Sequence, residues 1–195
     1  MSKRFALLSA VAFSALAITA SVIAPATAED KKMMKSELSG EKTVMVGGSA
    51  MFPSKNIIQN AVNSKDHTTL VAAVKAAGLV ETLEGKGPFT VFAPTNAAFG
   101  KLPAGTVDTL VKPENKATLT KILTYHVVPG KLEASSLTNG KKLKTVEGEE
   151  LTVKLADGKV WIIDAKGGTS AVTIANVNQS NGVIHVVDTV LMPAS

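Results

Sequence analysis

The chain has 195 residues, no cysteine and a formal net charge of +5 at pH 7. The lack of cysteine excludes disulfides, thiolate metal sites and a lipoprotein anchor, so the fold must be stabilised by packing alone. Its lysines are interspersed with acidic residues and aromatic residues make up 4% of the chain, which argues against a nucleic-acid partner.

An N-terminal export signal is predicted over residues 1–28. Two basic residues precede the uncharged, apolar stretch 5–24, and Ala26 and Ala28 occupy the small-residue positions of a cleavage site. We expect cleavage after Ala28, a secreted or periplasmic mature protein, and no stable membrane span after cleavage. The alternative is an uncleaved anchor, since about 20 apolar residues can span a bilayer.

The mature chain loses those two basic residues, so its charge is +3, and we expect it to form one domain over residues 44–195. A polar leader, residues 29–43, lacks hydrophobic periodicity and is expected to be flexible. Residues 44–56 are an apolar, glycine-containing N-terminal addition, and a short helix with Ile57 and Ile58 on its inner face follows.

Periodicity predicts helices in the first half of this domain. One amphipathic helix ends before Gly78, which suits a left-handed stop, and Asp66 is placed to cap its start. Its apolar residues recur at intervals of three and four: Leu70, Ala73, Val74 and Ala77. A buried strand is predicted over 87–94, and Thr95 or Asn96 is placed to cap the turn of helix that follows.

Strands are predicted in the second half, after two further helices over residues 106–123. Alternating apolar residues flank Asp157-Gly158, which is a strong signal for a two-residue hairpin turn. Two more strands are predicted over 171–177 and 183–191. Because helices come first and strands later, the sequence indicates an α+β fold.

Three histidines stand 59 residues apart, at positions 67, 126 and 185, and are the main candidates for chemistry in this chain. The sequence lacks a phosphate-binding loop, a nucleophile elbow and a close histidine pair, so we predict no catalytic residue, no metal and no cofactor. His67, at the start of a helix, is expected to be solvated. A hydrolase that uses His126 is the least favoured alternative.

His126 and His185 each begin a His-Val-Val run. A buried neutral imidazole has one donor and one acceptor that must both be matched. Apolar residues flank His185 on both sides, so we predict a structural role for it. His126 precedes Pro129-Gly130 and is expected near an accessible strand end, where a structural or a binding role fits.

Three segments resemble the conserved boxes of fasciclin domains in order and spacing. They are "GPFTVFAPTNAAF" (87–99), "YHVVPG" (125–130) and "NGVIHVVDTVLMP" (181–193). The resemblance extends over about residues 54–193 and identifies the chain as a small exported bacterial fasciclin-domain protein. It implies an α+β unit, a wedge-shaped β-sandwich of about seven strands with helices packed alongside.

The resemblance also implies a role in adhesion at cell surfaces and in the extracellular matrix. In animal members the Tyr-His region is associated with integrin binding, and it corresponds here to Tyr125 and His126, our candidate partner-binding residues. Residues expected to serve the fold are Thr95, Asn96, His185 and Asp188.

Two functional hypotheses follow. The first is a non-catalytic binding or cell-adhesion module that recognises a protein or polysaccharide surface in the envelope or matrix. The alternative is a carrier of a small apolar ligand, carotenoid or lipid-like, since some algal fasciclin proteins bind carotenoids. Met51 and Phe52 would then line an apolar groove, because methionine adapts to varied apolar shapes; packing as an extra edge segment is the other interpretation of residues 42–56.

Overall fold

The computed structural model describes residues 41–194, so the predicted export signal and the leader up to residue 40 lie outside the described residues. The strands are β1 (Val44–Val46), β2 (Ser49–Met51), β3 (Phe89–Pro94), β4 (Val127–Pro129), β5 (Lys142–Lys144), β6 (Glu150–Ala156), β7 (Lys159–Ile163), β8 (Thr169–Gln179) and β9 (Gly182–Val187). The helices are α2 (Ile57–Ala61), α3 (Thr68–Ala77), α4 (Val80–Glu84), α5 (Asn96–Gly100), α6 (Thr106–Leu110) and α7 (Lys116–Tyr125). Short 3₁₀ turns are η1 (Lys65–His67), η2 (Pro113–Asn115) and η3 (Ala134–Ser136).

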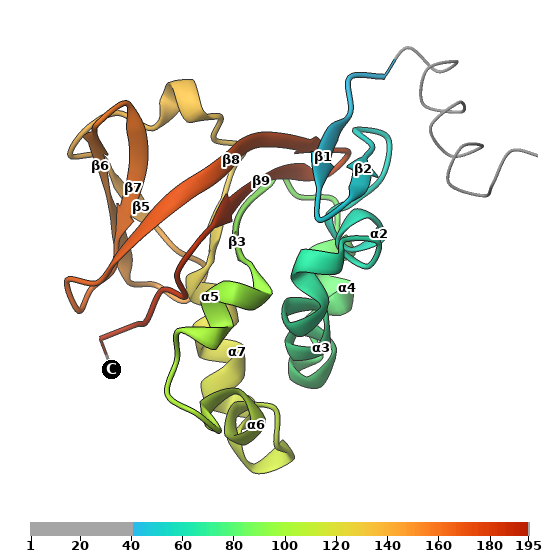
Figure 1. Cartoon of the computed structure of the whole chain (residues 1–195), viewed down its shortest axis with the longest axis vertical. Coiled ribbons are helices and arrows are strands. Elements are labelled where there is room, and N and C mark those ends of the chain that lie inside the picture. Colours follow the sequence, from blue (N-terminus) through green and yellow to red (C-terminus); the bar gives the residue numbers. More distant parts are fainter. Residues whose placement is uncertain (1–40, 195) are drawn as a thin grey trace, which may run out of the picture.

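The main sheet has seven strands in the order β4-β3-β9-β8-β7-β6-β5. Neighbouring strands are antiparallel except for β3 and β9, which run parallel. The backbone N–H of Val146, just after β5, donates to the carbonyl of Val127 in β4 at 2.8 Å, so the two edges of the sheet meet and the sheet nearly closes. The helices lie together beside β3 and β9, away from β5–β7 (Figure 1). The predicted α+β fold is confirmed.

Strand alternation divides the core into two clusters. In β3, Val91 and Ala93 belong to the cluster between sheet and helices, whereas Phe92 belongs to the cluster inside the curled sheet. In β9, Ile184 and Val187 are divided in the same way. Because both faces of these strands are buried, their sequences read as unbroken apolar runs and not as alternating ones.

Several local predictions can be compared with the structure. Gly78 ends α3 in the left-handed region at φ +73°, as predicted. Asp66 lies within η1 and not at the start of α3, so its prediction as the cap is wrong. Thr95 caps α5 by accepting a backbone N–H at 3.2 Å. Asp157 and Gly158 join β6 to β7 with φ values of +54° and +70°, the geometry of a two-residue hairpin turn.

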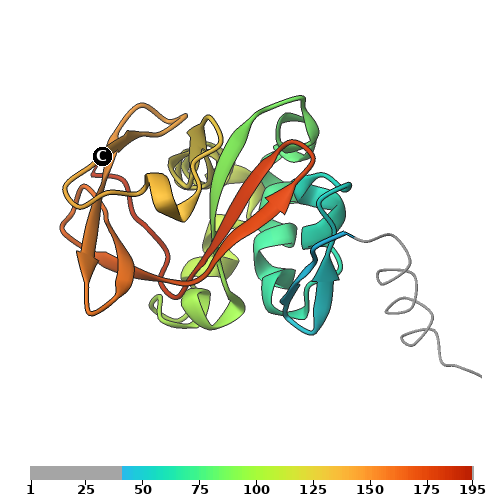
Figure 2. The same cartoon turned by 90° about the horizontal axis from the view of Figure 1, so that it is seen from above.

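The N-terminal addition forms a hairpin of its own. Strands β1 and β2 pair with each other in a separate two-stranded sheet around Gly47-Gly48, whose φ values are +57° and +75°. The expectation of an added edge segment is therefore wrong, because the segment pairs with itself. Its inner residues Val46 and Met51 are buried in the cluster beneath the helices. Figures 1 and 2 both place the hairpin beside α2, at the opposite end of the molecule from β5–β7.

Candidate binding site

His126 is buried, and its ring links two segments of the chain. It follows the last residue of α7, and its side chain is 2% exposed. Its Nδ1 donates to the Ile122 carbonyl at 2.8 Å, and the backbone N–H of Leu191 donates to Nε2 at 3.0 Å. Burial lowers the pKa of His126 to about 4, and the Leu191 N–H also requires an unprotonated Nε2. The expected accessible strand end is thus wrong, because the ring ties α7 to the C-terminal segment.

Tyr125 points into the other cluster and is fully buried. Its hydroxyl accepts the backbone N–H of Ala165 at 2.8 Å and donates to the Glu150 carbonyl at 3.4 Å. Burial raises the pKa of Tyr125 to about 12. The two residues predicted to bind a partner therefore lie side by side in the chain but on opposite sides of the core, and neither reaches the surface.

The four residues expected to serve the fold all make internal contacts. His185 stacks on Phe92, with ring centroids 5.7 Å apart, and its Nε2 donates to the Leu132 carbonyl at 2.7 Å. Asn96 accepts the Thr69 N–H and donates to the Lys65 carbonyl, which joins α5 to the start of α3. Thr95 caps α5, as described above.

Asp188 holds the end of β9 against β8. One carboxylate oxygen accepts the Ala171 N–H at 2.9 Å and the Thr189 hydroxyl at 3.0 Å, and the other lies 3.3 Å from Lys101 Nζ. These donors hold the pKa of Asp188 below its ordinary value, although partial burial opposes them.

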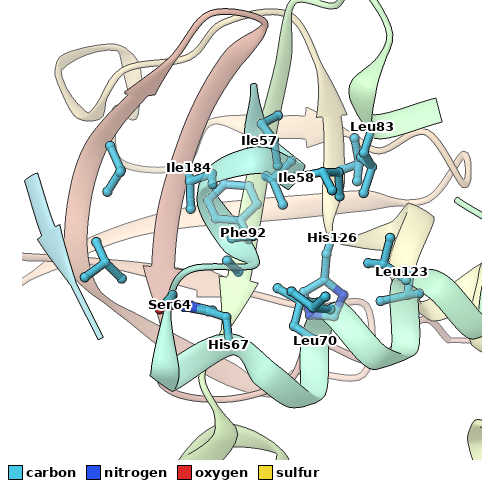
Figure 3. Close-up of a pocket in the computed structure, with 18 of the residues that line it drawn as sticks. Ile57, Ile58, Ser64, His67, Leu70, Leu83, Phe92, Leu123, His126 and Ile184 are labelled. Carbon is cyan, nitrogen blue, oxygen red and sulfur yellow. Dashed lines mark hydrogen bonds between the residues drawn. The ribbon is translucent and has the colours of Figure 1, made fainter. Parts of the chain in front are cut away.

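An apolar cavity of about 40 Å³ lies between the helices and the sheet. Its lining is contributed by the β1–β2 hairpin, α2, α3, α7, β3 and β9, with Phe92 and Ile184 on the sheet side (Figure 3). Met51 lines it, as the groove hypothesis requires. Phe52 lies outside the lining and is only half-buried, with Lys55 Nζ 4.9 Å from its ring centroid.

His67 is the cavity residue that the sequence interpretation missed. It is 3% exposed, so the expectation of a solvated side chain is wrong. Its Nδ1 lies 2.9 Å from Ser64 Oγ, and Figure 3 shows the two side chains against the cavity wall. Burial lowers the pKa of His67, opposed in part by the Ala93 backbone. The signal was available: His67, immediately before α3, precedes Leu70 and Val74 of the inner face of that helix at spacings of three and four.

The outer side of the curled sheet carries a different surface. Leu143, Val153 and Ile162 point inward, so their strand neighbours point outward. We call these the basic sheet face: Lys142, Lys144, Thr152, Lys154, Trp161 and Ile163. Lys154 pairs directly with Trp161, the only tryptophan of the chain. Lys142 pairs with Thr152, and its Nζ lies 3.1 Å from a carboxylate oxygen of Glu150.

Over residues 41–194, no helix is long and apolar enough to cross a membrane. In the same described part of the chain, no group of three or more histidine, aspartate or glutamate side chains is placed to hold a metal ion.

The fold and these sites define the class of protein. A nearly closed, seven-stranded mixed sheet flanked by helices is the fold of a solved insect structure, the FAS1 domain pair of the cell adhesion molecule Fasciclin I. The TM-score is 0.65 at 19% identity, over 72% of this chain and 52% of that chain. This chain therefore spans about half of the solved pair.

The chain belongs to the fasciclin-domain family, whose pattern matches residues 65–193. It is 52% identical over 153 residues to the Synechocystis protein sll1483, covering 78% of this chain and 82% of that protein. It is 39% identical to the immunogenic protein MPT70 of Mycobacterium tuberculosis, covering 68% of this chain and 66% of that protein. It is also 38% identical to the cell surface glycolipoprotein MPB83 of Mycobacterium bovis, covering 76% of this chain and 64% of that protein. Fasciclin domains are generally non-catalytic.

Proposed function

We propose that this protein is an exported, non-catalytic binding module of the bacterial envelope or matrix, and that its partner is an acidic polysaccharide. The observation that carries the proposal is the basic sheet face. Lys142, Lys144 and Lys154 are exposed there around the half-buried Trp161, and Glu150 is the one acid among them on strands β5–β7. An aromatic ring offers a flat apolar contact for a sugar, and the surrounding ammonium groups attract carboxylates or sulfates.

Export and adhesion have separate support. The first 28 residues have the composition of a cleavable signal, and the related protein MPB83 is named as a cell surface glycolipoprotein. Tyr125, His126 and His185 are engaged in internal hydrogen bonds. Recognition of a partner therefore falls to the exposed faces of the domain, and we assign Tyr125 and His126 a bracing role beneath them.

The test measures binding of the mature chain to alginate, with neutral dextran as the reference polymer. Binding is monitored by titration calorimetry at two salt concentrations. We expect alginate to bind, and we expect the double variant K142Q/K154Q to bind at least tenfold more weakly. Its matched control is K75Q/K112Q, which removes the same charge from exposed positions on the helical side and should bind as the unaltered protein does.

Equal loss of binding in both double variants would mean that net charge alone drives retention, and the basic sheet face would not be the site. If alginate does not bind, and the mature chain instead retains a protein from an envelope extract, the partner is a protein and not an acidic polysaccharide.

A second candidate function is a carrier of a small apolar ligand. It is favoured by the cavity that Met51 lines. Protein purified from its own host should then carry an added mass under native mass spectrometry, with an absorption band if the ligand is a pigment. A ligand-free protein that ignores added lipids and pigments would contradict this function.

A further inference from the structure

The cavity is completed by residues outside the stretch that matches the family. Six of its nineteen lining residues come from the segment 44–64, whereas the family match begins at residue 65. These six are Val46, Met51, Ile57, Ile58, Ala61 and Ser64. The family core therefore supplies the floor and far walls, and the N-terminal segment supplies the cover.

One polar atom in this apolar lining makes no hydrogen bond of normal geometry within the described residues. His126 has both ring nitrogens bonded, and Ser64 Oγ is bonded to His67 Nδ1. His67 Nε2 is buried and makes no hydrogen bond of normal geometry to any residue of the described chain. The Ser64 hydroxyl can donate to or accept from Nδ1, and the Ala93 backbone favours the protonated ring, so Nε2 is best suited to act as a donor.

The size of the cavity limits its occupant. About 40 Å³ exceeds the volume one water needs, which is about 10–15 Å³, but a stable buried water also needs two to four polar partners. His67 Nε2 offers one. The lining thus favours a compact apolar molecule with a single hydrogen-bonding group. The flexible Met51 side chain can change rotamer to accommodate a larger molecule.

The cover has two parts, helix α2 and the β1–β2 hairpin. Helix α2 is tied to the β8–β9 turn, because the Ile57 N–H donates to Asn181 Oδ1 and Asn60 bonds to Gln179. The β1–β2 hairpin is joined by hydrogen bonds to residues 60–65, as in the 3.2 Å bond from the Lys65 N–H to the Gly47 carbonyl. Val46 and Met51 of the hairpin are buried, so both parts of the cover are held against the rest of the domain.

We propose that this cavity is a binding site for a small neutral molecule with an apolar body and one hydroxyl group, which bonds to His67 Nε2 beneath the β1–β2 hairpin. The proposal rests on the carrier function and names its site and ligand class.

Phenol and toluene are suitable probes because they share a shape and differ in the hydroxyl group. Both are titrated into methyl-labelled mature protein and followed by NMR. Phenol should shift the methyl signals of Met51, Ile57 and Ile184 in a saturable way. Met51→Ala, which enlarges the cavity, should bind phenol at least fivefold more tightly than the unaltered protein.

His67→Phe should weaken phenol binding at least fivefold and leave toluene binding within twofold. Leu155→Ala, at an exposed position on β6, is the control and should behave as the unaltered protein. The Met51→Ala titration does not depend on His67, so the site is still tested if His67→Phe fails to fold.

Absence of saturable shifts in both the unaltered protein and Met51→Ala would show that the cavity is a packing void, and would overturn the proposal. The carrier function can fail separately. If host-purified protein is empty but phenol saturates the cavity, the site stands and the carrier function falls. If a native ligand is retained equally by Met51→Ala and His67→Phe, the carrier function stands and this site falls.

Discussion

Each histidine of the described chain is buried, and each has a different set of partners. His126 accepts from Leu191 and His185 donates to Leu132, so both rings join segments far apart in the sequence. His67 instead bonds to Ser64 in the preceding turn, and its Nε2 makes no hydrogen bond of normal geometry within the described residues. His67 and His126 line the same cavity, whereas within residues 41–194 no group of three or more potential ligand side chains is placed to hold a metal ion.

At the residue scale, His126→Ala and His185→Ala should each lower the free energy of unfolding by about 1–3 kcal/mol, since each leaves buried backbone groups unpaired and opens a void. Both side chains are at most 2% exposed, so the two costs should be comparable. Urea denaturation at pH 7.5 measures both, with Lys112→Ala as an exposed control. A cost for His126→Ala no larger than that of the control would show that its two hydrogen bonds are dispensable.

A second residue-scale prediction concerns acid. Burial lowers the pKa of His126 to about 4 in the folded protein, against about 6.5 in the unfolded chain. Between these values the unfolded state binds more protons, so stability must fall as the pH is lowered through this window, by up to about 3 kcal/mol. Burial lowers the pKa of His67 and His185 in the same direction.

Urea titrations at pH 7.5, 6.5 and 5.5 stay above the carboxylate range and measure this slope. His126→Ala should have a shallower dependence than the unaltered protein. Identical slopes for the two proteins would mean that His126 is not neutral in the fold.

At the element scale, the β1–β2 hairpin depends on two adjacent glycines for different reasons. A Cβ on Gly47 would lie 2.4 Å from Ser64 Oγ and 2.7 Å from the Asp66 backbone nitrogen, whereas a Cβ on Gly48 would meet nothing within 4 Å. Both have positive φ, so both alanine variants carry the same kind of backbone strain, about 1 kcal/mol. Gly47→Ala should therefore cost at least about 2 kcal/mol more than Gly48→Ala, since the clash involves backbone.

Thermal unfolding of the two glycine variants gives this difference directly. Their NMR spectra give a second check, because Gly47→Ala should shift the His67 ring signals through Ser64 and Gly48→Ala should not. Equal melting temperatures would indicate that the hairpin does not press on Ser64 in solution.

At the scale of the whole molecule, the segment before the family match is part of the fold. Val46, Met51, Ile57 and Ile58 are all buried in the cluster beneath the helices. Their removal would forfeit about 1.5–3 kcal/mol each, a sum comparable with the whole stability of a typical domain, about 5–15 kcal/mol. A chain that begins at residue 65 should therefore lack cooperative thermal unfolding by circular dichroism.

The companion chain, beginning at residue 41, should melt within about 2 °C of the chain that begins at residue 29, since the sequence of the leader is polar and lacks hydrophobic periodicity. A cooperative transition in the chain from residue 65 would show that the family core is stable without its cover.

The two candidate binding sites lie at opposite ends of the molecule. The hairpin that covers the cavity and the β5–β7 strands that carry the basic sheet face are far apart in both views (Figures 1 and 2). A variant at Met51 should for this reason leave the binding of an acidic polysaccharide unchanged, and a variant at Lys154 should leave the cavity unchanged.

The sequence alone determined the elements whose signals are local. The stop at Gly78, the cap at Thr95 and the Asp157-Gly158 turn depend on the backbone preferences of one to three residues. The order of the predicted elements, helices first and strands later, then indicated the α+β class.

Burial and hydrogen-bond partners depend on contacts between distant segments, which the local sequence does not specify. The Leu191 N–H that fixes His126 lies 65 residues away in the sequence, and the Asn181 side chain that anchors α2 lies 124 residues from Ile57. Burial of His67 likewise depends on residues of the hairpin, β3 and β9, which line the same cavity. A side chain's local sequence limits its conformation, but its solvent exposure and its hydrogen-bond partners are set by whichever segments the whole fold brings against it.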